Sequence, residues 1–166
     1  MKLKTSRISV KNLKAAHKIY NYYIKYSFSN FEERVLTFSK FYKNYKIIVS
    51  NNLPYILAIE DEVVVGLAYL NSFREKSGYK YSFENTIYLH KDYLGRGIGA
   101  KLLSKLIVNS KKNKNIKKIV AVIGSIDSKV SVKLHKKLGF KKVGLLKKIG
   151  FKKGKWIDSI FMQKDL

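Results

Sequence analysis

Three glycines at alternate positions separate an apolar, strand-like segment from an amphipathic one. They stand in Gly95-Arg96-Gly97-Ile98-Gly99-Ala100, shortly after the strand-like residues 79–89. Beyond the turn, apolar residues recur at helical spacing, in Ile98, Leu102, Leu103, Leu106 and Ile107. Glycine tolerates positive φ and brings bare backbone N–H groups close to a ligand, and a helix N-terminus attracts anions. The pattern predicts a strand, a tight turn and a helix, with an anion site at the turn.

Three other kinds of glycine-rich turn can be compared with these residues: a P-loop, a dinucleotide-binding turn and a turn without a ligand. A P-loop is excluded, because Ala100 and Leu102 stand where that motif needs glycine and a hydroxyl side chain. A dinucleotide-binding turn tolerates this glycine spacing, but it also requires an acidic residue at the end of the next strand, and residues 119–123 supply none. A structural turn without a ligand stays open at this point.

Strand-like and helix-like segments alternate along the chain without a Pro-rich or Gly-rich linker. Helices are expected after a cap at Asn12, at residues 36–44 and at residues 130–138, the last ending at Gly139. Strands are expected at residues 6–10, 46–49, 55–60, 63–70, 79–89, 119–123, 141–149 and 156–163, with a hairpin at Asp61-Glu62. We therefore expect one domain, residues 1–166, with a mixed α/β (α+β) fold of about seven mostly antiparallel strands flanked by about four helices.

The charge of the chain is strongly positive, with 35 Lys and Arg against 11 Asp and Glu and a formal net charge of +24. Such a balance suits nucleic acid, an anionic membrane or a phosphorylated ligand. The only arginines, however, are Arg7, Arg34, Arg74 and Arg96, and the lysines are spread over the whole chain. A dedicated nucleic-acid reader concentrates arginine where bidentate contacts are needed. A general lysine bias is favoured, and no specific nucleic acid is expected as partner.

Cysteine is absent, which excludes disulfides, thiolate metal sites and a cysteine nucleophile. The histidines His17, His90 and His135 lack metal-ligand spacing, so no metal is expected. No apolar run has the length of a signal peptide core or of a membrane span. We expect a cytoplasmic protein that does not act at a membrane.

The glycine turn resembles the pyrophosphate-binding motif of the GNAT superfamily of N-acetyltransferases, Gln/Arg-x-x-Gly-x-Gly/Ala, with Gly97 and Gly99 in the defining positions and Leu94 departing from Gln or Arg. Five further matches in the same order resemble the branch of phosphinothricin and methionine sulfoximine or sulfone acetyltransferases. They are residues 19–23 with 31–33, residue 79 with 84–88, and residues 121–124, 134–140 and 150–158. The resemblance covers most of the chain. It implies a GNAT-like fold, acetyl-CoA as acetyl donor and a homodimer.

For the cofactor, the resemblance implies two contact regions. Backbone groups of Ile87, Tyr88 and Leu89 would hold the pantetheine arm, and one of their N–H groups can stabilise an oxyanion. The pyrophosphate would lie on the turn formed by Gly95, Arg96, Gly97, Ile98, Gly99 and Ala100. An Asn-x-x-Ser pattern of the family is altered here: Ser128 and Ser131 occupy its ends, with Asp127 beside the first. A cofactor contact is expected from these serines.

Acetyl transfer requires a neutral amine and a protonated leaving thiolate. Glu84 lies in an otherwise apolar and aromatic strand, where burial raises the pKa of a carboxyl and makes it a better base at neutral pH; a salt bridge to Lys or Arg is the structural alternative. His135 follows Ser131 at i,i+4, so both can point to one face of a helix. The resemblance implies that Glu84 and His135 act in proton transfer, directly or through water.

The acceptor side rests on a segment before the central strand. Phe73, Arg74, Lys76 and Tyr79 resemble the substrate loop of the family, and Arg74 and Lys76 can pair with a carboxylate. Asn85 and Thr86 can bind polar atoms of the substrate. The function expected is acetyl transfer by direct attack of a small amino-acid-like amine. The alternatives are another amine, such as a polyamine or a protein N-terminus, and a basic nucleic-acid-binding module.

Overall fold

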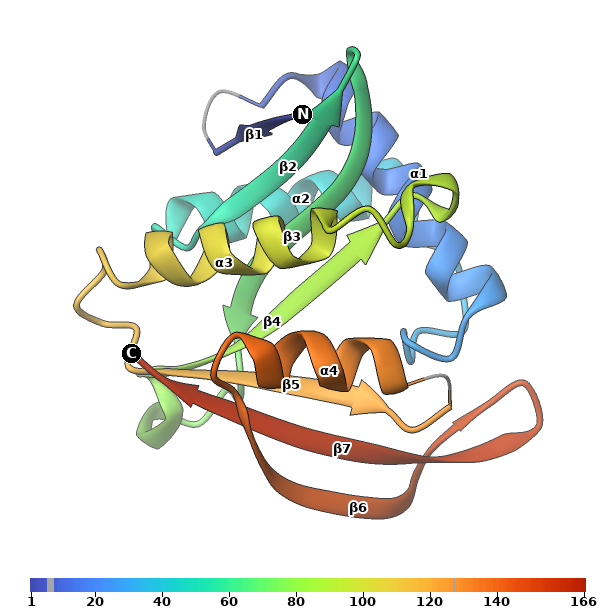
Figure 1. Ribbon diagram of the computed structural model, residues 1–166, viewed down its shortest axis with the longest axis vertical. Helices are drawn as coiled ribbons and strands as arrows, with labels where there is room; N and C mark the ends of the chain where they lie inside the picture. Colours follow the sequence, from blue (N-terminus) through green and yellow to red (C-terminus); the bar gives the residue numbers. More distant parts are fainter. Residues whose placement is uncertain (6–7, 127) are drawn as a thin grey trace.

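The computed structural model of the chain describes residues 1–5, 8–126 and 128–166. Its strands form one seven-stranded sheet in the order β1-β2-β3-β4-β5-β7-β6 (Figure 1). The strands are β1 (Lys2–Lys4), β2 (Tyr55–Glu60), β3 (Val63–Ser72), β4 (Ser82–Leu89), β5 (Lys118–Gly124), β6 (Lys141–Lys152) and β7 (Lys155–Asp165). The helices are α1 (Val10–Tyr26), α2 (Phe38–Ser50), α3 (Ile98–Ser110) and α4 (Lys129–Lys137), with short 3-10 turns η1 (Ser77–Tyr79) and η2 (Lys91–Tyr93). The mixed α/β fold expected from the sequence is confirmed.

Neighbouring strands of the sheet run antiparallel except β4 and β5, which are parallel. The β2–β3 hairpin turns on Asp61 and Glu62, whose φ values of 46° and 64° give the left-handed pair that a two-residue hairpin needs. This turn was expected from the sequence. Gly139, with φ of 84°, follows the last turn of α4 and ends it as expected.

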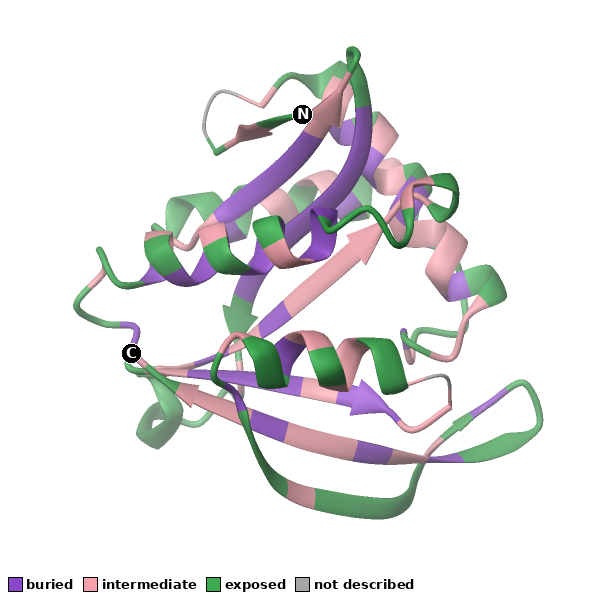
Figure 2. Cartoon of the chain, viewed as in Figure 1, coloured by how far each residue is buried: buried purple, intermediate pink, exposed green. Residues whose placement is uncertain are grey.

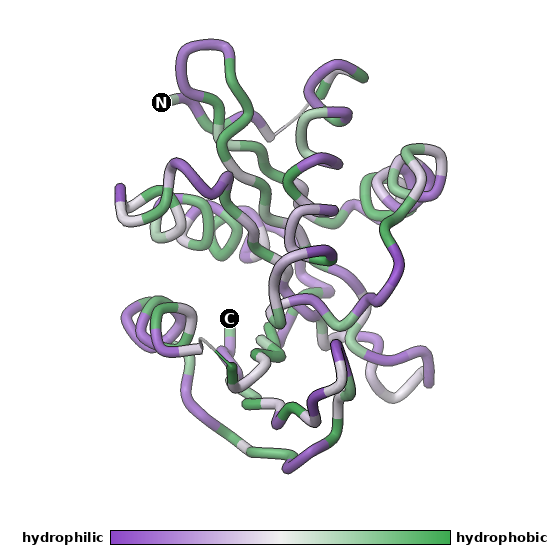
Figure 3. Tube along the Cα trace, turned by 90° about the vertical axis from the view of Figure 1, so that its right-hand side faces the viewer, coloured by the Kyte–Doolittle hydropathy of each residue, from purple (hydrophilic) through white to green (hydrophobic). Residues whose placement is uncertain are grey.

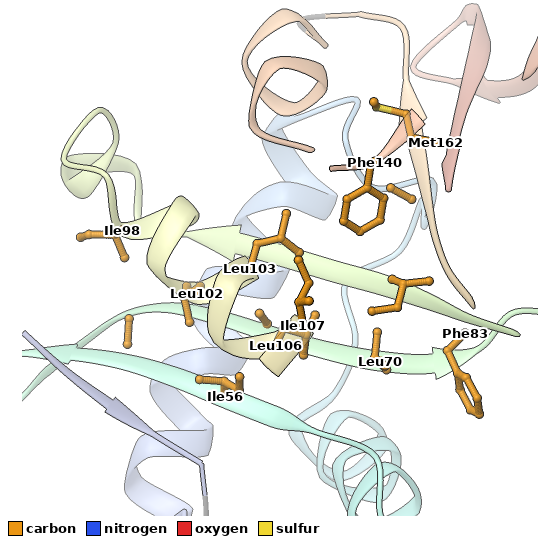
Figure 4. Packing of buried hydrophobic residues seen from close by; sticks show 14 of the residues in the cluster. Ile56, Leu70, Phe83, Ile98, Leu102, Leu103, Leu106, Ile107, Phe140 and Met162 are labelled. Atoms are coloured by element: carbon orange, nitrogen blue, oxygen red, sulfur yellow. The ribbon is translucent and has the colours of Figure 1, made fainter. Parts of the chain in front are cut away.

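Helices cover both faces of the sheet around β2 and β3, where alternate residues of a strand serve different faces. In β2, Ile56 belongs to a core cluster with α3, whereas Leu57 belongs to a second cluster with α1 and α2. Figure 4 shows the first cluster, in which leucines of α3 pack on the sheet. Buried positions concentrate along β2, β3 and β5 (Figure 2), and hydrophilic and hydrophobic residues alternate along the helices (Figure 3).

Two expectations for the N-terminal third were wrong. The strand expected at residues 6–10 is replaced by the earlier β1; Ser6 and Arg7 lie outside the described residues, and Val10 already begins α1. The cap of α1 is Ser9, whose Oγ accepts from the N–H of Asn12 at 3.3 Å. The predicted residue Asn12 is therefore the third residue of the helix.

A strand was also expected at residues 46–49, but these residues continue α2 to Ser50. The structure buries Phe41 and Ile48, two helical turns apart, and leaves Ile47 and Val49 exposed. A short apolar run fits both the helical and the strand period, and here packing of the helix against the sheet decides for the helix. Likewise, the strand expected from residue 79 begins at Ser82, because Tyr79 ends the turn η1.

The parallel pair β4–β5 holds only over a short stretch. Its register covers Ser82–Glu84 of β4 against Lys118–Val120 of β5. Beyond this stretch the two strands diverge, as Figure 1 shows. Backbone groups on the facing edges of β4 and β5 are thereby left without a neighbouring strand. In the part of the chain that the structure describes, no helix is both long and apolar enough to cross a membrane.

Candidate active site

A cavity of about 980 Å³ lies where β4 and β5 separate. Its walls come from α1 and the loop after it, from β3, β4 and β5, from the glycine turn with the first turn of α3, and from α4. Segments far apart in the sequence thus meet around one space large enough for a substantial ligand. Among the described residues, no group of three or more His, Asp or Glu side chains is placed to hold a metal ion.

One wall of the cavity is the open edge of β4. The N–H of His90 donates to the carbonyl of Val65 at 2.8 Å, and antiparallel bonding alternates along a strand pair. Tyr88 therefore bonds toward β3, whereas Ile87 and Leu89 turn their backbone groups toward the space between β4 and β5. The hydroxyl of Tyr23 donates to the Leu89 carbonyl at 2.8 Å. Of the three residues expected to hold a pantetheine arm, Ile87 and Leu89 present backbone groups and Tyr88 presents its ring.

The glycine turn closes another side of the cavity. Gly95 and Gly97 have φ of 77° and 73°, and Gly97 is the N-cap of α3. The first intrahelical bond shown there joins the N–H of Lys101 to the Gly97 carbonyl at 3.2 Å, so the N–H groups just before Lys101 lack helical acceptors. The cavity is lined here by Leu94, Gly95, Gly97, Ile98, Gly99 and Ala100. Free N–H groups and the helix dipole make this end suitable for a phosphate.

Arg96 is the exception within the turn. Its guanidinium lies 4.7 Å from the ring centroid of Tyr93, and its Nη1 is 3.8 Å from Glu60 Oε2. The Arg96 side chain is therefore held outside the cavity lining. Any contact of this residue with a cofactor would come through its backbone.

Glu84 lines the cavity at the last position where β4 pairs with β5, opposite Asn71 of β3 and beside Val120 of β5. Burial raises the pKa of its carboxyl above the ordinary value, and the nearby positive charge of Arg74 opposes this rise. Within the described residues, no salt bridge to Glu84 is found, so the structural alternative considered for it does not apply there. The arrangement suits a base that works near neutral pH.

His135 lies in α4 with 2% of its surface exposed and the edge of its ring against Phe140. Its Nδ1 is 2.8 Å from the carbonyl of Ser131, so Nδ1 carries the proton and donates it. Its Nε2 then accepts from Nδ2 of Asn85 at 3.0 Å. Burial lowers the pKa of the imidazole, against the effect of the Ser131 bond.

This bonding restricts what His135 can do. Both ring nitrogens are occupied by protein partners, so the imidazole can reach a substrate proton only if Asn85 gives up its bond. Asn85 itself lines the cavity, and its buried Oδ1 has no partner among the described residues. His135 is thus bonded to Asn85 at one nitrogen and to the Ser131 carbonyl at the other. Ser128 and Ser131 both line the cavity nearby, while Asp127 lies outside the described residues.

The structure does not bring the predicted substrate loop into the cavity. Phe73 packs edge-on against Tyr79 with ring centroids 5.9 Å apart, and Arg74 lies over the Phe73 ring at 5.1 Å. Neither these residues nor Lys76 belong to the lining, whereas Asn85 and Thr86 do. The positive charge of Arg74 nevertheless opposes the rise in the pKa of the Glu84 carboxyl.

The acceptor side contains residues that the sequence matched to a pattern without assigning a role. Tyr20 and Tyr23 of α1 line the cavity, with Tyr23 stacked on Tyr88 at 4.5 Å and Tyr20 edge-on to it at 5.6 Å. Phe31 and Glu32, in the loop after α1, line it as well. The signal that could have found them is a carboxylate beside aromatic residues in a loop between two helices.

Comparison with known proteins agrees with this geometry. The family model described as acetyltransferase (GNAT) domain matches residues 6–161. The chain is 31% identical to a phosphinothricin N-acetyltransferase of Alcaligenes faecalis over 93% of its length and 78% of that protein. It is also 31% identical to an L-methionine sulfoximine/L-methionine sulfone acetyltransferase of Salmonella typhimurium, over 92% of its length and 88% of that protein.

Solved structures share the whole fold. A GNAT superfamily phosphinothricin acetyltransferase from Sinorhizobium meliloti in complex with AcCoA superimposes with a TM-score of 0.91 at 32% identity, covering 100% of this chain and 89% of that one. A ribosomal-protein-alanine N-acetyltransferase from Brucella melitensis superimposes with a TM-score of 0.94 at 28% identity, covering 100% of both chains. The fold is thus similar to that of enzymes whose names point to different acceptors.

Proposed function

The protein belongs to the acetyltransferase (GNAT) family and is an acetyl-CoA-dependent N-acetyltransferase, and we propose that its acceptor is the amine of a small amino-acid-like molecule. The acceptor class is that of phosphinothricin, methionine sulfoximine and methionine sulfone, named for relatives about 31% identical to this chain. We propose further that residues 1–166 act as one N-acetyltransferase domain.

The separation of β4 from β5 is the observation that carries this function. It opens backbone groups of Ile87 and Leu89 into a cavity that extends from the N-terminus of α3 to Glu84. A cofactor with a pyrophosphate at one end and a thioester at the other fits such a space. The amides at the start of α3 would bind the pyrophosphate, and the edge of β4 would pair with the amide groups of the pantetheine arm.

Glu84 would prepare the acceptor for attack. Its carboxylate takes a proton from the acceptor ammonium, directly or through one water, and passes it to solvent. The neutral amine nitrogen then forms a bond to the acetyl carbonyl carbon while an N–H group on the β4 edge, from Ile87 or Leu89, polarises the carbonyl oxygen. When the carbon–sulfur bond breaks, the second proton of the nitrogen passes to the departing thiolate. His135 would keep Asn85 in place beside this site.

An amino-acid acceptor also needs a group that binds its carboxylate. Arg74 and Lys76 stay our candidates, although neither side chain lines the cavity. The positive charge of Arg74 opposes the rise in the pKa of Glu84, so an acceptor with its amine at Glu84 would have its carboxylate toward Arg74. Arg is well suited to such a bidentate contact.

A panel of acceptors tests the proposal. With acetyl-CoA in excess and thiol release as readout, we expect methionine sulfone, methionine sulfoximine and phosphinothricin to give the highest kcat/KM. A peptide with N-terminal alanine should be slower, and spermidine slower still because the protein carries a net charge of +24. Faster turnover of the peptide would instead assign the protein to N-terminal acetylation. A lack of turnover with every primary amine would refute the proposed function.

We also propose that the protein is a cytoplasmic homodimer. The edge strand β6 and its hairpin with β7 expose several large apolar side chains, which a second copy could cover. They are Val143, Leu145, Leu146, Ile149, Phe151 and Trp156. The cytoplasm is the compartment in which acetyl-CoA and free amino acids meet. Sedimentation velocity would test the dimer, with a single monomer species at all concentrations as the contrary result.

A further inference from the structure

Lys152 at the end of β6 is a buried lysine, with 2% of its surface exposed. Its Nζ donates to the carbonyl of Ser27 at 2.9 Å and also to the carbonyl of Asn30. Within the described residues it forms no salt bridge. A buried ammonium loses hydration worth several kcal/mol, so these two carbonyls are the partners that make its position tolerable.

Both carbonyls belong to residues 27–32, the segment after α1 that we name the acceptor loop. Its own bonds give it a compact shape: the N–H of Ser29 donates to Ser27 Oγ, and the N–H of Glu32 donates to Asn30 Oδ1, each at 2.9 Å. Asn30 is 6% exposed, so its carbonyl needs an internal partner. Five of the six residues of this loop, all except Phe28, line the cavity.

The end of the β6–β7 hairpin presses on the same loop at a second point. A Cβ added at Gly150 of β6 would overlap the ring of Phe31. The end of β5 lies against the loop as well, since a Cβ added at Gly124 would lie 2.8 Å from the carbonyl of Phe28. The ammonium groups of Lys153 and Lys155 lie over the Phe28 ring at 5.5 Å and 5.9 Å. The hairpin and the loop after α1 lie on the same side of the molecule in Figure 1. The acceptor loop therefore packs against the C-terminal hairpin and the end of β5.

We propose that Lys152 is a positioning residue for the acceptor, which holds the acceptor loop in the shape that presents Phe31 and Glu32 to the cavity. The inference rests on the proposed function and deepens it, because it assigns the shape of the acceptor pocket to a side chain outside that pocket. The glycine turn and the open edge of β4, which form the cofactor side, make no bond with Lys152. Loss of Lys152 should therefore affect the acceptor and spare acetyl-CoA.

Lys152→Met tests the inference, since methionine keeps much of the buried chain and removes the donor. The matched control is Lys142→Met, an exposed lysine of the same strand that stands opposite Met162. Leaving the two carbonyls unpaired predicts an acceptor KM about 5-fold to 150-fold higher, with the Kd for acetyl-CoA unchanged. Hydrogen exchange should become faster in residues 27–32 and stay unchanged in β4. Gly150→Ala, which displaces Phe31 directly, should also raise the acceptor KM.

Each outcome decides the inference. A raised acceptor KM with unchanged acetyl-CoA affinity supports it, whereas a fall in kcat alone, with both substrates bound as before, would show a merely structural lysine and overturn it. If the wild type turns over no acceptor, the proposed function fails, and hydrogen exchange alone decides on Lys152. The inference would then be overturned if hydrogen exchange in residues 27–32 of Lys152→Met were no faster than in the control Lys142→Met.

Discussion

Replacing Glu84 by glutamine is expected to lower kcat/KM for the acceptor by about 10²-fold to 10⁴-fold at neutral pH, the range for loss of a general base. Glutamine keeps the size of the side chain and its place at the last position where β4 pairs with β5 but cannot take up a proton. Near neutral pH the acceptor amine is an ammonium, so loss of the base removes the step that makes it nucleophilic. At alkaline pH the amine is already neutral, and the loss should become much smaller.

The pKa of Glu84 also predicts the shape of the wild-type profile. Burial raises this pKa, so the carboxylate is protonated, and unable to act as a base, at pH values where an exposed glutamate is still ionised. The acid limb of the kcat/KM profile should therefore lie at a higher pH than the ordinary pKa of a glutamate predicts. The Glu84→Gln variant should lack this limb. Glu62→Gln, in the exposed hairpin turn, is the control. An equal loss at all pH values would argue against a base role.

Gly97→Val should weaken acetyl-CoA binding by about 5-fold to 150-fold, which corresponds to the roughly 1–3 kcal/mol of a strained left-handed residue. Gly97 has φ of 73° and caps α3, and a β-branched residue adopts this conformation poorly. Apart from its chain neighbours, no described residue has an atom within 4 Å of a Cβ added there, so the effect would come from the backbone and not from a clash. A calorimetric titration with acetyl-CoA measures it.

Gly78→Val is the matched control for this substitution. A Cβ at Gly78 also meets nothing within 4 Å, and its φ lies outside the left-handed region. The affinity of this control for acetyl-CoA should equal that of the wild type. Wild-type affinity in Gly97→Val would mean that the turn does not hold the phosphates, and the cofactor would have to be placed elsewhere in the cavity.

The glycine turn and Glu84, which both line the cavity, could be singled out because their signals are local in sequence. Three glycines within residues 95–100 indicate a turn with positive φ. Glu84 stands out because it is a carboxylate in an apolar strand. Residues 46–49, which were wrongly expected to form a strand, contain no such local signal of their secondary structure. Their apolar run fits either period, and only packing against the sheet makes it part of α2.

The acceptor side could not be predicted to the same extent, because long-range contacts define it. The role of His135 depends on Asn85, which is 50 residues away, and the shape of the loop after α1 depends on Lys152, which is 122 residues from Asn30. The resemblance implies proton transfer by His135, whereas we propose from its bonds that it holds Asn85. Phe73, Arg74, Lys76 and Tyr79 resembled a substrate loop, yet the fold keeps them out of the cavity lining.

A crystal structure with acetyl-CoA and methionine sulfone tests the central claim most directly. We expect the pyrophosphate at the N-terminus of α3, the pantetheine arm along the edge of β4 that Ile87 and Leu89 present, and the acceptor nitrogen at Glu84, in direct contact or through one water. Acetyl-CoA bound outside the space between β4 and β5, or an acceptor nitrogen remote from Glu84, would contradict the account.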